Sequence, residues 1–169
     1  MDDNITKEQL VEELNSSFSA VALEDIRRAL DPNVNTNLAV FILGVCLIDA
    51  LAGFYGGKEK PISKGNKDRF KDFIRKYLGQ YNPDDLWEVR NGMLHSYAVE
   101  KYAFVNKKSH FHNKPTNGGK FINDENFYKD LETAYKSFRD DILTNSDPTI
   151  FINVKKRYKA LGLMRIRSI

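Results

Sequence analysis

The stretch Leu38–Tyr55, LAVFILGVCLIDALAGFY, is the most apolar part of the chain and contains a single charged residue, Asp49. It is long enough to cross a membrane, but an acidic residue near the middle of a membrane helix is costly. A helix that is apolar all round is typical of the centre of a bundle, and Gly56 and Gly57 should end it. We therefore expect the central helix of a helical domain, with Cys46 as an inert buried thiol.

Amphipathic patterns on both sides of this stretch predict further helices. Between about residues 98 and 123 the sequence is instead rich in aromatic and β-branched residues around the turn-like KPTNGG, which predicts an inserted β-hairpin. The fold class is therefore mainly α: a single helical-bundle domain over residues 1–169, with a hairpin insertion after the fourth helix and a basic C-terminal helix and tail at about 148–169. The predicted helices cover about residues 6–30, 37–54, 70–78, 82–97, 124–143 and 149–161.

Size and composition exclude several classes of protein. A chain of 169 residues can bury enough surface to fold without a disulfide or a metal, and its one cysteine cannot form an intramolecular bridge. The start, MDDNITKEQL, has neither the basic nor the apolar region of a secretion signal, so we expect a reduced, cytoplasmic setting. Six Lys and Arg residues and no acid follow Asp147, which indicates either a solvated helix face or a phosphate-attracting patch.

The helix that starts at Asn82 ends in an unusual polar cluster, RNGMLHSY, at Arg90–Tyr97. At about 100° per residue, Arg90 and His95 lie about 140° apart on the helix, with Asn91 between them. This spacing suits a ligand that lies in a groove along the helix. A metal site would prefer ligands one turn apart, so we expect no metal and no cofactor.

The side chains of this cluster fit the chemistry of phosphodiesters. Arg90 can hold a phosphate by two hydrogen bonds, and His95 can transfer a proton near neutral pH. Asn91 can orient the imidazole or bind a phosphate oxygen. Cleavage of RNA by its own 2′-hydroxyl needs a base, an acid and positive charge at the phosphorane, so the cluster predicts a metal-independent endoribonuclease. Two alternatives stay open: a non-catalytic domain that binds RNA, a nucleotide or a protein, and a structural dimerisation domain.

The segment from Arg90 to Tyr97 resembles the R-x4-H motif of the HEPN superfamily, in the R-x4-H-x-Y form of HEPN toxins that pair with nucleotidyltransferase antitoxins. The resemblance implies a helical bundle, usually a homodimer whose two motifs face each other across a cleft. It implies that Arg90 and His95 are catalytic, that Asn91 assists, and that Tyr97 lines the site and is the residue an antitoxin modifies with AMP. Many members cleave RNA without metal, whereas others bind RNA or act as scaffolds.

Asp49 is the one charge of the most apolar helix, and a buried carboxylate is costly unless it is paired. We expect it to support the cluster, either by pairing with Arg90 or by orienting His95. The alternative is a pair with another basic residue or a helix end.

The insertion offers a second set of candidate residues. Lys107 and Lys108 are candidate RNA-binding cations. His110 and His112 would share one face of a strand, where exposed histidines are expected rather than metal ligands. Three aromatic residues could stack bases, although packing of the hairpin against the bundle is the simpler interpretation; they are Tyr102, Phe104 and Phe111.

Overall fold

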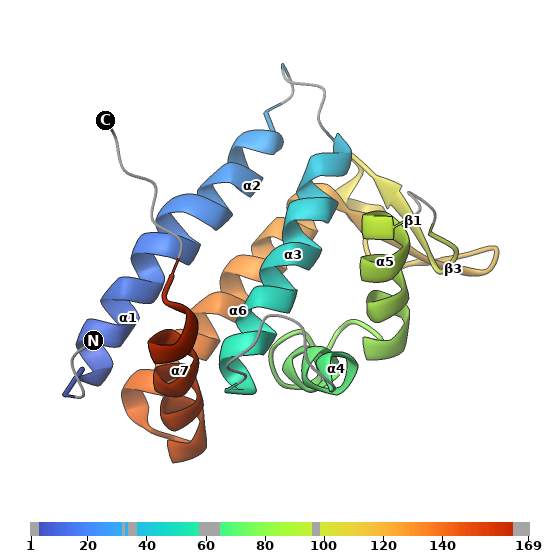
Figure 1. The fold of residues 1–169 in the computed structure, drawn as a ribbon. Helices are drawn as coiled ribbons and strands as arrows, with labels where there is room; N and C mark the ends of the chain where they lie inside the picture. The colour runs from blue at the N-terminus through green and yellow to red at the C-terminus, as the bar shows by residue number, and fades with distance from the viewer. Residues whose placement is uncertain (1–3, 32, 34–36, 58–64, 96–98, 164–169) are drawn as a thin grey trace.

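The computed structural model describes residues 4–31, 33, 37–57, 65–95 and 99–163, and it is mainly helical with a small three-stranded sheet (Figure 1). The helices are α1 Lys7–Leu14, η1 Asn15–Leu23, α2 Glu24–Ala29, α3 Asn37–Tyr55, α4 Asn66–Tyr77, α5 Pro83–His95, η2 Ser109–Phe111, α6 Asp124–Thr144 and α7 Pro148–Leu161. The strands are β1 Tyr102–Val105, β2 Pro115–Thr116 and β3 Gly119–Asn123.

Helix α3 is the central helix, as its sequence predicts. It lies between the α1–α2 helix and α5 in Figure 1, with α6 behind it, and it contacts α2, α4, α5, α6 and α7. Its apolar stretch Leu38–Tyr55 is long enough to span a membrane, but 56% of it is buried within the protein, which is typical of the core helix of a soluble bundle.

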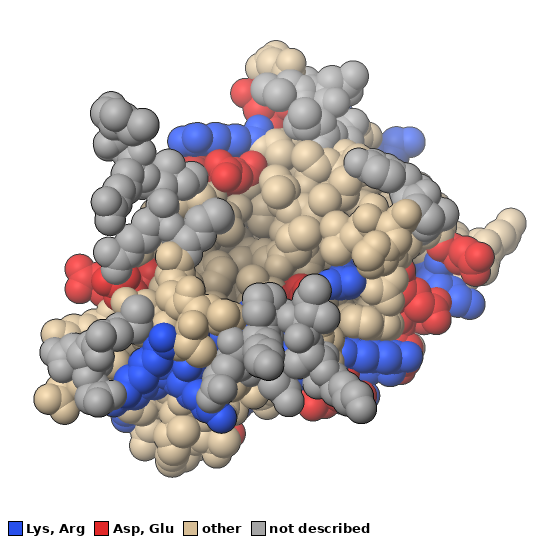
Figure 2. Space-filling model, viewed as in Figure 1, with Lys and Arg blue, Asp and Glu red and all other residues tan. Residues whose placement is uncertain are grey.

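One side of α3 stays open, and this side corrects the expectation for Cys46. The cysteine is exposed rather than buried. Leu38 and Leu43 of the same helix are also exposed, at 42% and 38%, because the helix is apolar all round but its neighbours cover only part of it. Figure 2 shows one face of the molecule, on which uncharged surface covers much of the area over α3 and Lys and Arg side chains gather over α7.

The first helix is continuous from α1 to α2 but contains a π-helical segment, η1. Ordinary helical spacing from Phe18 predicts burial of Val21 and Ala22. The structure instead buries Leu23, five residues after Phe18, and leaves Val21 and Ala22 partly exposed. The change follows from the wider turn of a π-helix, whose hydrogen bonds join residues five apart.

The inserted segment forms a sheet of order β1-β3-β2, which only partly matches the expected hairpin. The strands β2 and β3 are antiparallel around Asn117 and Gly118, and Gly118 has a φ of +104° that favours glycine. The first aromatic segment, β1, pairs with β3 in parallel. The reason is that η2 and the turn after it reverse the chain before β2 begins.

The sheet is fixed to the bundle by aromatic and polar contacts, which also corrects the expectation that His112 is exposed. Its Nε2 lies 3.2 Å from a carboxylate oxygen of Asp130 on α6, and its Nδ1 accepts from the backbone N–H of Asn123 at 3.1 Å. Tyr81 donates to the same oxygen of Asp130 at 2.6 Å. His110, by contrast, is exposed, but it lies in η2 and not on a strand.

Candidate functional site

The expected contact between Asp49 and Arg90 is present where α5 packs on α3. Arg90 Nη2 donates to Asp49 Oδ2 at 2.9 Å, and Arg90 Nη1 donates to Asn91 Oδ1 at 3.0 Å. The guanidinium also lies over the ring of Trp87, 5.3 Å from its centroid. Arg90 takes this position because it follows Val89, at the edge of the buried stripe of α5 that also contains Leu86 and Met93.

The ion pair is half-buried, and part of its hydrogen-bonding capacity is unused. The side chains of Arg90 and Asp49 are 18% and 25% exposed. In the part of the chain that the structure describes, Arg90 Nε and Asp49 Oδ1 are buried without a hydrogen-bond partner. Since a guanidinium has five N–H donors and a carboxylate accepts at both oxygens, the pair does not use all of its hydrogen-bonding groups.

His95 is the last residue of α5 and is exposed. It lies five residues after Arg90, which is about 7.5 Å along the helix axis at 1.5 Å per residue. Within the described ranges, no hydrogen bond or ion pair joins it to Arg90, Asn91 or Asp49. The structure therefore places the two principal residues on one helix but not in one hydrogen-bonded cluster. Tyr97 lies outside the described residues.

Two arginines that the sequence reasoning missed lie close to this pair. Arg69 of α4 and Arg157 of α7 are only 6% and 8% exposed. Burial lowers the pKa of Arg69; the negative charge of Asp49 acts to raise this pKa, and the positive charge of Arg90 acts to lower it. Burial also lowers the pKa of Arg157; the charge of Arg69 lowers this pKa further, and the charge of Asp49 acts to raise it. Three guanidinium groups and the Asp49 carboxylate thus share one electrostatic environment with a positive balance among these four residues.

The position of Arg157 depends on a glycine of the central helix. Its guanidinium lies against Gly53, where an added Cβ would come within 2.5 Å of Arg157 Cζ, and over the ring of Phe54 at 5.2 Å. The sequence contains the pattern that could have predicted this. Arg157 falls on the buried stripe of α7 with Ile150 and Val154, at spacings of seven and three residues.

Lys107 and Lys108, the candidate RNA-binding residues, are exposed in the turn after β1. Lys107 has a φ of +56°, and Lys108 Nζ lies 6.0 Å from the ring centroid of Phe111. Of the aromatic residues proposed to stack bases, Tyr102 is buried at 6% exposure and cannot do so. Phe111 packs on the rings of His110 and Phe121. Phe104 is partly exposed and lines a crevice.

No group of three or more His, Cys, Asp and Glu side chains that could hold a metal ion occurs among the residues with a described position. Comparison of the chain with protein-family models, with curated proteins and with solved structures finds no match.

Proposed function

We propose that the chain is a HEPN-like homodimer that acts in the cytoplasm as a metal-independent endoribonuclease. The observation that supports this most is the fixed guanidinium of Arg90, which Asp49 and Asn91 hold at the α3–α5 seam on the same helix as the exposed His95. A cation that is pre-oriented before the substrate arrives can stabilise charge in a transition state without reorganisation.

In the proposed reaction the 2′-oxygen of the RNA attacks the adjacent phosphorus, and the bond from phosphorus to the 5′-oxygen breaks. The 2′-hydroxyl loses a proton and the 5′-oxygen gains one, so the products are a 2′,3′-cyclic phosphate and a 5′-hydroxyl. His95 serves as the general acid or base, and Arg90 binds the charged phosphorane. Asn91 and Asp49 act as positioning residues for Arg90. The second proton transfer falls to His95 of a second copy or to water.

The proposed dimer uses the open apolar side of α3. Leu43 on α3 and Leu94 on α5 are large apolar side chains that are 38% and 37% exposed, and Cys46, also exposed, lies on α3. A second copy placed there would remove this surface from water and bring two α5 helices together. Under this proposal a nucleotidyltransferase-type antitoxin is a further partner, and Tyr97 its target.

A non-catalytic domain that binds RNA, a nucleotide or a protein is the alternative. It is favoured by one observation: both Nη atoms of Arg90 already donate to the protein, and only 18% of the side chain is exposed. An arginine of this kind can serve to hold α5 on α3. In that case His95 would not be needed for any reaction.

The test is incubation of the purified protein with total RNA in excess chelator, comparing wild type, His95→Ala and the matched control His110→Ala. Both histidines are exposed, so neither change should alter the circular dichroism spectrum. We expect cleavage by wild type and His110→Ala, fragments that end in a cyclic phosphate, and no cleavage by His95→Ala. Equal cleavage by all three would remove His95 from the mechanism. RNA binding without cleavage by wild type would favour the alternative.

A further inference from the structure

A crevice lies at the N-terminal end of α3, where β1 and the end of α5 approach it. One part has a volume of about 220 Å³ and is lined by Leu38, Phe41, Phe104, Val105 and Asn106. A neighbouring part of about 240 Å³ is lined by Leu38, Met93, Val99 and Phe104. Since Leu38 and Phe104 belong to both parts, the Phe104 ring is a shared wall of one divided crevice.

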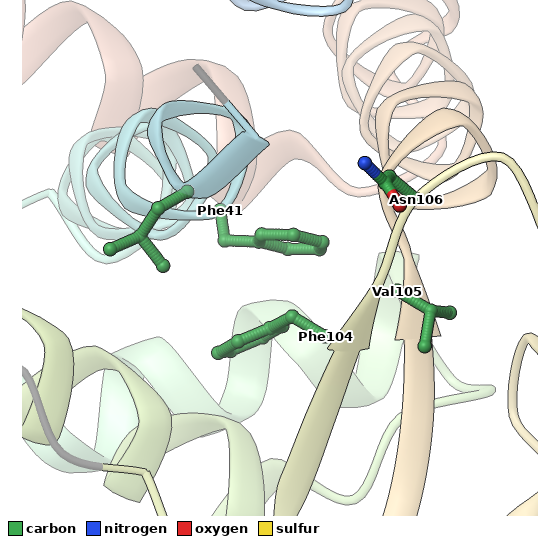
Figure 3. A pocket seen from close by; sticks show the side chains of 5 residues that line it. Phe41, Phe104, Val105 and Asn106 are labelled. Carbon is green, nitrogen blue, oxygen red and sulfur yellow. The ribbon is translucent and has the colours of Figure 1, made fainter. Parts of the chain in front are cut away.

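Phe104 is a rigid aromatic wall because the core supports it from behind. Its ring lies 4.2 Å from that of Phe41, centroid to centroid, with 31° between the planes. Phe41 is 2% exposed and stacks in turn on Phe127 at 5.7 Å. Figure 3 shows the rings of Phe41 and Phe104 lying one above the other, with Asn106 to one side of them. The part of Phe104 that stays exposed is a fixed surface on which a flat ring can stack.

A polar residue lines the crevice, and two lysines follow it in the chain. Asn106 is exposed, and its amide has both donors and acceptors, which suits the edge of a nucleobase. Lys107 and Lys108 follow it directly and are exposed. Each part of the crevice, at about 220 and 240 Å³, is large enough for a single heterocycle. Single-stranded RNA is commonly bound by this combination of aromatic surface, amide and cations.

The crevice is also adjacent to the proposed site. Met93, which lines one part, lies three residues after Arg90, about 4.5 Å along the axis of α5 and about 60° round it. We infer that the Phe104–Asn106 crevice binds one nucleobase of an RNA strand whose neighbouring phosphate reaches Arg90. This inference rests on the proposed function, because it assumes that the ligand is RNA. It adds a subsite at which base preference is set by Phe104 and Asn106.

The experiment measures binding of fluorescent single-stranded 2′-deoxy oligonucleotides by anisotropy, because they lack the attacking hydroxyl. The variants are Phe104→Leu, which keeps an apolar side chain but removes the ring, and Asn106→Ala. The matched control is Phe121→Leu, a partly exposed aromatic residue on β3 outside the crevice. We expect Phe104→Leu to bind about 5- to 100-fold more weakly, which is the range for loss of one stacked base. Asn106→Ala should reduce the difference in affinity between homopolymers.

An oligonucleotide with one abasic position gives the sharper result. Wild type should lose affinity for it, whereas Phe104→Leu should lose little more, because both changes remove the same stack. Equal binding by wild type, Phe104→Leu and Phe121→Leu would overturn the inference, even if wild type cleaves RNA. Binding with the predicted Phe104 dependence but without cleavage of RNA would support the crevice and reject the catalytic role of His95. Absence of binding to any oligonucleotide would reject both.

Discussion

Replacement of Asp49 should destabilise the protein more than replacement of its partner Arg90. The two side chains form an ion pair at 2.9 Å, but Asp49 also raises the pKa of Arg69 and of Arg157. Asp49→Asn therefore removes a negative charge that acts on three guanidinium groups. Arg90→Met leaves Asp49 beside two cations and keeps an unbranched side chain that can pack on Trp87.

The magnitude follows from the exposure of the pair. Removal of one partner from a fully buried ion pair costs about 3–5 kcal/mol, whereas exposed pairs contribute about 0–1 kcal/mol. Because the side chains are 18% and 25% exposed, we place Asp49→Asn at about 2–3 kcal/mol. Arg90→Met should lower the free energy of unfolding by about 1–2 kcal/mol. The double variant should lose less than the sum of the two single losses, since the two residues are in contact.

The free energy of unfolding is measured by urea denaturation, followed by circular dichroism at one fixed protein concentration. The melting temperature of Asp49→Asn should be about 4–12 °C below that of wild type, since 1 kcal/mol corresponds to about 2–4 °C for a chain of this size. The matched control is Glu88→Gln, an exposed acid on α5, which should change stability by less than about 0.5 kcal/mol. If Asp49→Asn is no worse than Glu88→Gln, or costs less than Arg90→Met, the electrostatic reasoning is wrong.

Two further predictions concern packing and pH. Gly53→Ala should destabilise the protein by about 1–2 kcal/mol despite the better helix propensity of alanine, because the new Cβ would displace the guanidinium of Arg157. The control is Gly79→Ala, which should not destabilise the protein in this way, because its new Cβ meets its nearest neighbour at 3.7 Å. Thermal melts of both variants test the prediction. Burial raises the pKa of Tyr81, and the nearby Asp130 raises it further. Burial and Asp141 raise the pKa of Tyr77 in the same way. Burial also raises the pKa of Tyr102, to about 12. Because these folded values exceed the unfolded value of about 10, the stability they contribute is present below pH 10 and is lost as the pH rises above it. Absorbance at 295 nm should show these tyrosines ionising together with unfolding, and titration of every tyrosine near pH 10 in the folded protein would contradict the prediction.

The sequence predicted those features that depend on local pattern. The central helix, the amphipathic helices and the Asn82 cap of α5 follow from periodicity and from residue types at helix ends. The contact of Asp49 with Arg90 followed from a different argument: a lone charge in an apolar helix needs a partner, and Arg90 is a permanent cation at the margin of another buried stripe.

Features that depend on tertiary packing could not be predicted in this way. The parallel pairing of β1 with β3 requires η2 to reverse the chain, and no short pattern indicates that. The partly buried position of His112 depends on Asp130, eighteen residues away, and on the backbone of Asn123. Exposure of Cys46 depends on which side of an evenly apolar helix its neighbours leave open, and the sequence of that helix cannot distinguish its sides.

The arginine cluster has a cost in stability. Burial of a guanidinium has a large desolvation cost, and apolar side chains of similar size at such positions are often neutral or stabilising. Here Arg69 and Arg157 are more than nine-tenths buried, beside an ion pair that is itself partly open to solvent. Binding of a polyanion at the open edge would use the combined charge of the three arginines. If the arginines bind RNA, Asp49→Asn should lower the stability of the protein and yet retain or strengthen its RNA binding. If the arginines serve only the structure, Asp49→Asn should lower stability and RNA binding together.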